Sequence, residues 1–555
     1  MKKIIITLVA AGVLCGCSLD EKILSSSTLE SYYQTSAQCI TGLNGCYTNI
    51  RNIYNNKEYF VVCEGQSDLL YINRSDQPNA VLMVTPSVPR FGSTTWTYCY
   101  LGVSRVNAVE AAIKRAPLTD AEKAPLLAEA TVLRSLFYYI LTSNFGDVPF
   151  YKDEVTDKNN DRIGRLPRMS ASATRDTLIK DLHKWILEKQ ALDMKPTHDA
   201  SNAQYCRAGA ALGLMLGGKL CLWQHRWTDA TEFFGALEDI YGDLSSYPLS
   251  DIPFANRQTR ESIMEISNIA VDYGLQVQGT LASICTPYRK VATAEGEDNN
   301  EDDEDEAEQD NADIYDGIGI PELGNQMRTQ TPFRPTKRFY QKLMPLSSGD
   351  LRRAAYTSTG APIEGGGGYL AWGWPGYYPD DDRSVAPRIF RYFNSTKSAS
   401  GRPYLGNKFW CFGMQYNLDS NSYKVFRYAG AILGLAEAWF QREDDEKACY
   451  YLNMVKARAG IKTVKPGDFA THEDLLHEIQ DEYARELFGE FQRKHDLVRW
   501  GIWYDTVWQY NVEAENNTRL RANMKPCHEY YPIPDDQVIN SRGTLDNKEY
   551  NKYGL

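Results

Sequence analysis

The sequence predicts a mainly α-helical protein, a scaffold of helix pairs with a loop-rich insertion that carries a few short strands. Three observations support this fold class. Long stretches with helical spacing of apolar residues flank a central region. Two of these stretches contain helix pairs that are rich in small residues. Between residues 245 and 421 the helical period weakens, and Gly, Pro, Asn and aromatic residues become frequent.

The predicted helices are stretches in which apolar residues recur at every third or fourth position. In residues 120–144, for example, Leu126, Ala130, Leu133, Phe137 and Ile140 fall on one helix face. In chain order the predicted helices are residues 96–114, 120–144, 174–190, 203–224, 228–241, 425–441, 444–459 and 472–491, with a shorter one after them.

Two helix pairs have the character of tetratricopeptide repeats. Gly217 and Gly218 lie in the first helix of one pair, and Ala429 and Gly434 lie in the first helix of the other. Small residues allow helix backbones to approach closely, and each pair has roughly the 34-residue length of such a repeat. Because the pairs are degenerate and far apart in the sequence, we expect a tetratricopeptide-like scaffold and not a regular solenoid.

The N-terminus has the pattern of a lipoprotein signal. Two lysines precede an apolar run from Ile4 to Leu14 that is too short to span a bilayer. The sequence Leu14-Cys15-Gly16-Cys17 resembles the lipobox of bacterial lipoproteins, which implies cleavage after Gly16 and acylation of Cys17. A plain secretory signal with a chance cysteine is the alternative. Acylation would anchor the protein to membrane lipid, and we expect no later segment to be long and apolar enough to span.

These features divide the chain into four regions. They are a signal peptide (1–16), an N-terminal helical region (17–244), the loop-rich insertion (245–421) and a C-terminal helical region (422–555). Within the insertion, SIMEISN (262–268) has the composition of a short strand, and residues 324–344 look partly helical.

The net charge of −12 comes from one part of the insertion. Residues 291–315 hold twelve acidic residues, all between positions 295 and 313, and no Lys or Arg. The rest of the chain is neutral, which argues against a nucleic-acid partner because phosphate binding needs a basic face. We interpret the run as a solvated loop. A structural calcium ion is the other interpretation, but the run lacks the ligand alternation and glycine turn of an EF-hand loop.

The chain contains no motif that favours an enzyme or a cofactor. Its twelve cysteines include no Cys-x-x-Cys pair, and most lie in apolar surroundings typical of core residues. His472 and His477 are five residues apart, whereas the zinc-protease motif needs a spacing of four to keep both on one helix face. We therefore expect neither catalysis nor a bound metal.

Several blocks of sequence, in order along the chain, match the pattern of one family. WTYCYLGVSRVNAVEAAI (96–113) and LLAEATVLRSLFYYILTSNFGDVPF (126–150) lie in the first half, and VFRYAGAILGLAEAWF (425–440), LNMVKARAG (452–460), DEYARELFGEFQRKHDLVRWG (481–501) and YPIPDDQVINS (531–541) in the second. With the lipobox, they resemble the SusD/RagB family of surface nutrient-binding lipoproteins of Bacteroidetes. The matching positions in the first half are Trp96, Tyr100, Asn107, Glu129, Ala130, Arg134, Tyr138, Tyr139, Gly146, Asp147, Val148 and Pro149.

The chain departs from this family in two places. Glu482 and Arg485 are spaced apart where the family commonly has adjacent Glu and Arg, and the tail DNKEYNKYGL (546–555) replaces a Gln-Asn-Pro-Gly-Tyr-like end. Read from the residues alone, Glu482, Glu486 and Glu490 form a helical stripe with Arg485 and Arg493 as neighbours, which predicts an ion-pair network. One helix face cannot place two carboxylates across a glycosidic bond, which argues against hydrolysis there.

The resemblance implies a glycan ligand, because family members commonly bind glycans through a few aromatic residues outside the helical motifs. The glycine-rich stretch 365–383 supplies rings that can stack on the C–H face of a sugar, with charged neighbours for its hydroxyls. The candidate ligand-binding residues are Trp372, Trp374, Tyr377, Tyr378, Asp380, Asp381 and Arg383, with a second cluster at Tyr71, Asn73 and Arg74. For Trp372 and Trp374 a packing role stays equally open; for Trp96, packing is favoured.

The resemblance further implies a SusC-like TonB-dependent transporter as partner, and an outer-membrane, lipid-anchored protein that faces the cell exterior. We expect it to bind oligosaccharides, without cleaving them, and to deliver them to that transporter. A peptide-binding member of the same family is the alternative, since the acidic loop 295–313 would attract basic peptides. A surface glycoside hydrolase is the less favoured third hypothesis.

Overall fold

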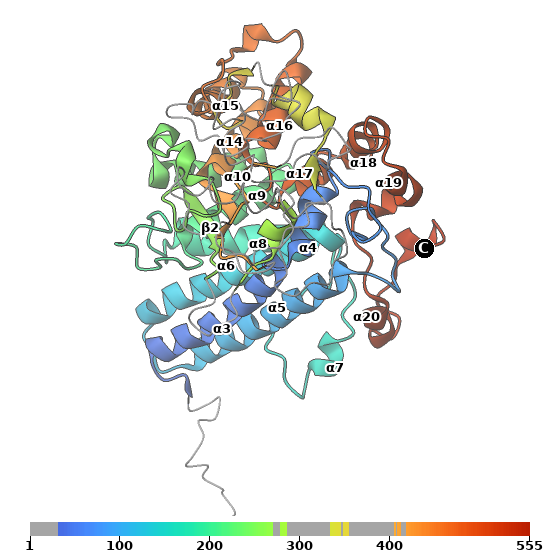
Figure 1. Cartoon of the computed structure of the whole chain (residues 1–555). Coiled ribbons are helices and arrows are strands. Elements are labelled where there is room, and N and C mark those ends of the chain that lie inside the picture. Colours follow the sequence, from blue (N-terminus) through green and yellow to red (C-terminus); the bar gives the residue numbers. More distant parts are fainter. Residues whose placement is uncertain are drawn as a thin grey trace, which may run out of the picture.

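The computed structural model describes residues 32–269, 278–285, 333–345, 348–353, 405–406, 408–411 and 418–555. Helices dominate these residues, as the sequence predicts, and the strands form two short two-stranded antiparallel sheets (Figure 1). The scaffold helices are α3 (Ser36–Tyr54), α5 (Phe91–Arg115), α6 (Asp120–Phe145), α8 (Ala171–Leu182), α9 (Ala210–Trp223), α10 (Trp227–Tyr241), α14 (Tyr428–Gln441), α15 (Asp445–Arg458) and α16 (His472–Glu486).

Helix α6 forms the centre of the first helical layer and packs against α3 and α5. A capping box between Thr119 and Glu122 starts it, and every residue from Ala128 to Phe145 is buried. By length and composition alone this helix could cross a membrane, so the expectation that no later segment is long and apolar enough was wrong. Most of its apolar stretch is buried inside the protein, as is expected of a core helix.

The helix pairs α9–α10 and α14–α15 stack directly on one another, because α10 packs against α14 although the insertion separates them in the sequence (Figure 1). The two pairs are thus far apart in the sequence, as predicted, but adjacent in space. Close contact is possible because the ring of Phe234 in α10 lies between glycines. A Cβ atom at Gly218 of α9 would lie 2.3 Å from that ring, and one at Gly434 of α14 would lie 2.4 Å from it. The predicted role of the small residues is thus confirmed.

Several predicted helix bounds were wrong. Residues 203–209 precede α9 as turns, and the predicted helix 174–190 ends as α8 followed by the π-helix η2 (His183–Glu188). The helix predicted at 472–491 stops at Glu486, and Gly489 then adopts a φ of +77° that glycine tolerates. The described helical core also includes α3 and several short helices near the C-terminus. They are α17 (Arg493–Arg499), α18 (Trp503–Val507), α19 (Thr518–Asn523), α20 (Asp535–Asn540) and α21 (Lys548–Asn551).

Both short sheets join described parts of the insertion to the scaffold. Strand β2 (Ser262–Ile266) confirms the strand predicted at 262–268 and pairs with β4 (Tyr423–Arg427). The first residues of the helix predicted at 425–441 therefore belong to a strand. Strand β1 (Leu70–Tyr71) pairs with β3 (Arg334–Pro335), which is followed by the π-helix η6 (Arg338–Leu343). The partial helix predicted at 324–344 is confirmed only over η6 among its described residues.

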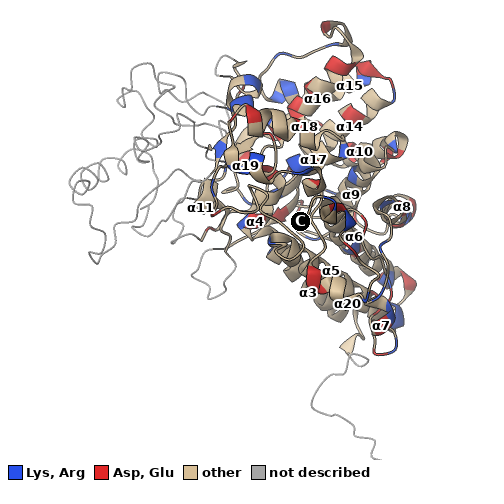
Figure 2. Ribbon diagram, turned by 90° about the vertical axis from the view of Figure 1, so that its right-hand side faces the viewer, with Lys and Arg blue, Asp and Glu red and all other residues tan. Residues whose placement is uncertain are grey.

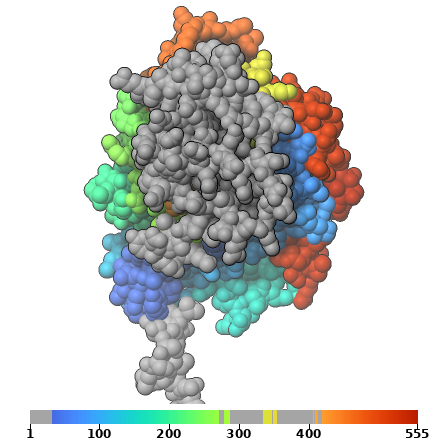
Figure 3. Space-filling model, in the orientation of Figure 1, coloured from blue at the N-terminus to red at the C-terminus, as the bar shows by residue number. Residues whose placement is uncertain are grey.

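The remaining short elements connect these layers. They are α4 (Lys57–Phe60), η1 (Val61–Gly65), α7 (Asn160–Ile163), η3 (Leu244–Ser246), η4 (Leu249–Asp251), α11 (Leu281–Cys285), η10 (Pro466–Asp468), η11 (Trp508–Glu513) and η12 (Pro526–Glu529). The C-terminal segment lies beside the N-terminal residues that follow η1, as the adjacent red and blue surfaces in Figure 3 show. Eight of the ten described cysteines are buried and all ten are free thiols, as expected for small core residues.

Candidate functional site

The structure describes one of the two predicted ligand clusters. Tyr71, Asn73 and Arg74 lie on the segment of residues 66–76 between η1 and the loop that leads to α5. The aromatic cluster (Trp372, Trp374, Tyr377, Tyr378, Asp380, Asp381 and Arg383), the acidic loop 295–313 and Cys17 lie outside the described residues.

Side-chain amides from the C-terminal region hold the backbone of the segment 66–76 in place. Asn511 Nδ2 donates hydrogen bonds to the carbonyl oxygens of Ser67 and Leu70, both at 2.7 Å. Asn517 Nδ2 donates to the carbonyl oxygen of Ile72, also at 2.7 Å. On the other side the pairing of β1 with β3 ties Tyr71 to the edge of the insertion. The backbone from Ser67 to Ile72 is thus held by contacts from two sides.

A buried ion cluster around Asp68 also holds this segment in place. The carboxylate of Asp68 accepts two hydrogen bonds from Arg493, at 2.8 and 2.9 Å, and Arg338 Nε lies 3.1 Å from it. Burial alone would raise the pKa of Asp68, but the guanidiniums of Arg493 and Arg338 hold it below its ordinary value. The guanidinium carbon of Arg338 lies 4.0 Å from the ring centre of Tyr510, in a cation–π contact.

The three predicted residues differ in their roles. Asn73 Oδ1 accepts a hydrogen bond from the backbone N–H of Arg519 at 3.2 Å, so it helps to satisfy the first turn of α19. Arg74 is exposed and forms a bidentate pair with Asp76, at 2.9 and 2.5 Å. Tyr71 is half-buried in β1. Arg74 is therefore the residue of this cluster whose side chain lies most openly at the surface.

The predicted ion-pair network of Glu482, Glu486 and Glu490 with Arg485 is confirmed, although Glu490 lies beyond the end of α16. The expectation that Arg493 joins this network was wrong, because Arg493 pairs with Asp68. All three side chains are fully buried. Glu486 contacts Arg352, Arg427 and Arg458 at 2.8, 3.0 and 2.6 Å, and Glu490 contacts Lys408 at 2.7 Å. Arg352 and Lys408 belong to the insertion, so the network fastens the insertion to the C-terminal helices. Carboxylates shielded from solvent in this way cannot reach a glycosidic bond.

Residues of the two family-matching blocks in the first half of the chain, 96–113 and 126–150, hold the scaffold together. Glu129 pairs with Arg207 at 2.7 Å and accepts a hydrogen bond from the hydroxyl of Tyr47 at 2.6 Å. Tyr100 donates to the carbonyl oxygen of Pro149 at 2.8 Å. Trp96 is 4% exposed and packs against Phe145, which confirms its expected packing role.

Three residues around the segment 66–76 were not predicted from the sequence: Tyr510, Asn511 and Asn517. They come from η11 and the turn after it, more than 400 residues away from the backbone that Asn511 and Asn517 bind. They occur in YNVEAENN (510–517), which has no helical or strand period and no motif. Only long-range packing brings them to this site.

The fold matches that of several solved structures. Surface glycan-binding protein A from Bacteroides thetaiotaomicron, solved in complex with laminarihexaose, superposes with a TM-score of 0.64 at 19% identity, covering 92% of this chain and 98% of that protein. A structure described as a laminarin-binding SusD-like protein gives a TM-score of 0.63 at 17% identity, covering 92% and 98%. The fold therefore places this chain among helical proteins with a tetratricopeptide-like scaffold.

Sequence comparison finds similarity to SusD-type families at both ends of the chain. A model described as "SusD family" matches residues 394–550, and one described as "Starch-binding associating with outer membrane" matches residues 20–207. SusD-like protein P25 of Formosa agariphila is 23% identical over 526 residues, which cover 91% of this chain and 90% of that protein. The starch-binding protein SusD of Bacteroides thetaiotaomicron is 31% identical over 128 residues, 23% of this chain and 21% of that protein. Both ends of the chain thus match models of SusD-type families.

Proposed function

We propose that this protein is a lipid-anchored receptor of the outer membrane that binds glycans at the cell surface and passes them to a TonB-dependent transporter. The observation that carries the proposal is the family match over both ends of the chain, with a rigid surface segment beside the insertion. Relatives of the same fold include proteins described as binding laminarin and starch. The lipobox at Cys17 supports anchoring to membrane lipid, and the matched model's description supports outer-membrane association.

The site acts by recognition without bond cleavage. Aromatic rings from residues 372–378 would stack on the sugar face, and Arg74 would bond sugar hydroxyls. Because the segment 66–76 is held by Asn511 and Asn517, little ordering would be needed on binding.

Calorimetric titration of the mature chain with laminarihexaose, maltoheptaose and a basic peptide tests the proposal. We expect saturable binding of at least one glycan and none of the peptide. Trp372→Ala, Trp374→Ala and Arg74→Ala should each weaken that binding, by roughly tenfold for a lost ring contact. Tyr450→Ala is the matched control, because Tyr450 is 58% exposed on α15, away from this segment.

Two results would contradict the proposal. Binding of the peptide with silence across all glycans would favour the peptide-binding alternative. New reducing ends after incubation with polysaccharide would establish hydrolysis instead of simple recognition.

A further inference from the structure

One arginine links the insertion to the segment 66–76. Arg338 opens the π-helix η6, and its guanidinium lies between two carboxylates: Nε is 3.1 Å from Asp68, and Nη2 donates to Asp481 at 2.8 Å. The guanidinium carbon also lies 4.0 Å from the ring centre of Tyr510. Asp68 belongs to the segment, Asp481 to α16 and Tyr510 to η11. A single side chain from the insertion therefore contacts three elements from other parts of the chain.

The chain around Arg338 is attached to the same segment. Residues 334–343, from β3 to the end of η6, are here called the strap; Figure 1 shows them in yellow beside α16. The backbone N–H of Thr336 donates to the carbonyl oxygen of Leu69 at 2.9 Å, and its hydroxyl donates to that of Asp68 at 2.6 Å. On the other side η6 packs against α16. The strap therefore lies between the segment and the C-terminal helices.

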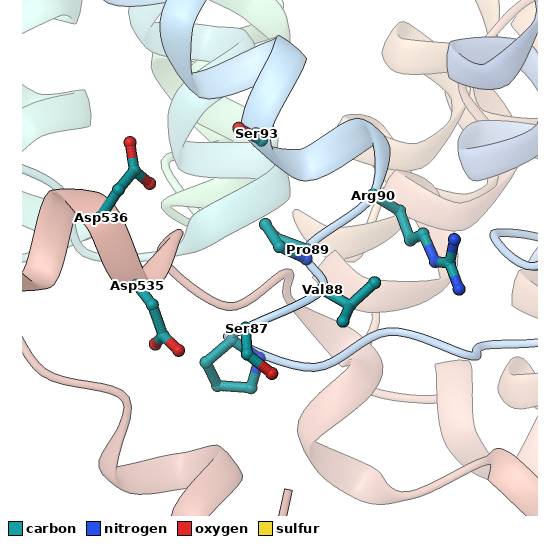
Figure 4. Close-up of a pocket in the computed structure, with 8 residues that line it drawn as sticks. Ser87, Val88, Pro89, Arg90, Ser93, Asp535 and Asp536 are labelled. Carbon is teal, nitrogen blue, oxygen red and sulfur yellow. The ribbon is translucent and has the colours of Figure 1, made fainter.

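The loop that continues the segment is attached a second time, farther along the chain. Residues 86–90 and the start of α20 line a surface pocket there (Figure 4). The backbone N–H of Asp535 donates to the carbonyl oxygen of Pro86 at 3.2 Å. Along the chain, Arg74 is nearer to Asp68 than to Pro86. A displacement at Asp68 therefore reaches Arg74 through fewer residues than a displacement at the pocket.

The junction would retain its other contacts without Arg338. Asp68 would keep two hydrogen bonds from Arg493, at 2.8 and 2.9 Å. Asp481 is 30% exposed, so water can replace Arg338 there. Neither carboxylate would become an isolated buried charge, which is the usual reason why loss of one ion-pair partner is costly. Arg338 therefore contributes more to the connection between strap and segment than to the stability of the fold.

We propose that Arg338 is a positioning residue that couples the insertion to the segment 66–76: it holds the strap against the segment and thereby raises the affinity of the surface at Arg74 for its ligand. A segment that is ordered before binding loses less conformational freedom when the ligand arrives. The ligand part of this inference rests on the proposed function. The order of the segment does not, because it is measured in the protein without ligand.

Hydrogen exchange of the ligand-free protein tests the order of the segment. In Arg338→Gln the backbone amides of residues 66–76 should exchange at least about tenfold faster, because the strap is no longer tied to Asp68. The thermal midpoint should stay close to that of the wild type. Arg338→Lys should give an intermediate rate, since an ammonium can reach one carboxylate but cannot bind both and stack on Tyr510.

Arg442→Gln is the matched control. The guanidinium carbon of Arg442 also lies 4.0 Å from an aromatic ring centre, that of Trp439, and its Nη1 donates to Thr231 Oγ1 at 2.9 Å. Arg442 directly follows α14, which lies apart from α19, the helix that Asn73 contacts, in both ribbon views (Figures 1 and 2). This variant should change neither the exchange of residues 66–76 nor the affinity for glycans.

Calorimetric titration measures the effect on binding. The probe is laminarihexaose or maltoheptaose, whichever the wild type binds. Arg338→Gln should weaken its binding by at least about fivefold, the lower range of coupling between distant sites. Arg338→Lys should weaken it by a smaller factor, which a role confined to folding would not produce while the thermal midpoint stays constant.

The outcomes separate this inference from the proposed function. Unchanged exchange of residues 66–76 in Arg338→Gln would overturn the inference. Faster exchange with unchanged glycan affinity would overturn the coupling to binding. A strongly lowered thermal midpoint in both variants would show a structural role instead. A wild type that binds no glycan would refute the proposed ligand, while the exchange rates would still decide whether Arg338 holds the segment.

Discussion

At the scale of single residues, stability depends strongly on charges that are buried in pairs. Glu486 is completely buried and contacts three guanidiniums, which together hold its pKa well below its ordinary value although burial alone would raise it. Ion pairs in such an environment need all their partners, because a charge left alone inside the protein is costly to desolvate.

We therefore expect Glu486→Gln to destabilise the protein by about 3–5 kcal/mol, since Arg352, Arg427 and Arg458 would share too little negative charge. Glu473→Gln on the same helix is the control; its side chain is 66% exposed, and its change should stay within about 0.5 kcal/mol. Denaturant unfolding of both variants measures the difference. Equal stability of the two would show that the network adds nothing.

At the scale of elements, the scaffold depends on glycines that let helices approach. Gly218 and Gly434 lie on two different helices, and both accommodate the ring of Phe234 from α10 between them. The stacking of α9–α10 on α14–α15 thus rests on the absence of two methyl groups.

Gly434→Ala should destabilise the protein by about 1–3 kcal/mol, the usual cost of overpacking, because the new Cβ would lie 2.4 Å from Phe234. Gly235→Ala within α10 meets no atom within 4 Å and should be neutral or stabilising by up to about 1 kcal/mol. The thermal midpoints of the two variants should therefore move in opposite directions or differ clearly. A shared shift would contradict close packing at Gly434.

At the scale of the whole molecule, segments far apart in the sequence complete one another. Glu64 accepts backbone hydrogen bonds from Gly489 and Gln492, at 3.2 and 3.0 Å. Lys494 Nζ donates to Gln66 Oε1 at 2.6 Å. The first and last helical regions thus share buried polar contacts, and their electrostatics affect stability jointly.

These buried groups predict the pH dependence of unfolding. Burial lowers the pKa of His495 to about 3 and of His528 to about 4, so the unfolded chain binds more protons there and stability falls as pH drops below 6.5. Burial raises the pKa of Glu64 to about 7 and of Asp419 to about 6. The folded chain therefore binds more protons at these two groups, and their contribution to stability rises as pH drops over the same range. The four effects oppose one another, so stability should change little between about pH 7 and 4.5.

Below about pH 4.5 the balance changes. Burial favours the neutral form of Glu482, but Arg352 and Arg485 outweigh it and lower its pKa to about 2, so its stabilisation is lost as pH falls from 4.5 towards 2. We expect a loss of about 1.4 kcal/mol per pH unit for each such proton. Urea midpoints at pH 7, 5.5, 4.5 and 3.5 measure this loss of stability. In the Glu482→Gln variant, stability should fall less steeply below about pH 4.5. A uniform decline from pH 7 would contradict this balance.

Local pattern and tertiary packing contributed differently to the predictions. Helical spacing predicted α5, α6, α10 and α15 closely, because burial of one face imposes that period on the sequence. Composition predicted β2, and charge spacing predicted the network around Glu486. The bounds at β4 and at Gly489 were missed, because strand pairing and a left-handed turn there depend on partners elsewhere in the chain.

By itself the sequence determined the fold class, the small-residue helix pairs and the family resemblance, because each is written in local composition and spacing. The tertiary structure alone decided that the pairs stack across the insertion and that Asn511 and Asn517 hold the segment with Tyr71 and Arg74. These contacts join residues hundreds of positions apart. No local period encodes such a contact, since it forms only when packing brings complementary groups together.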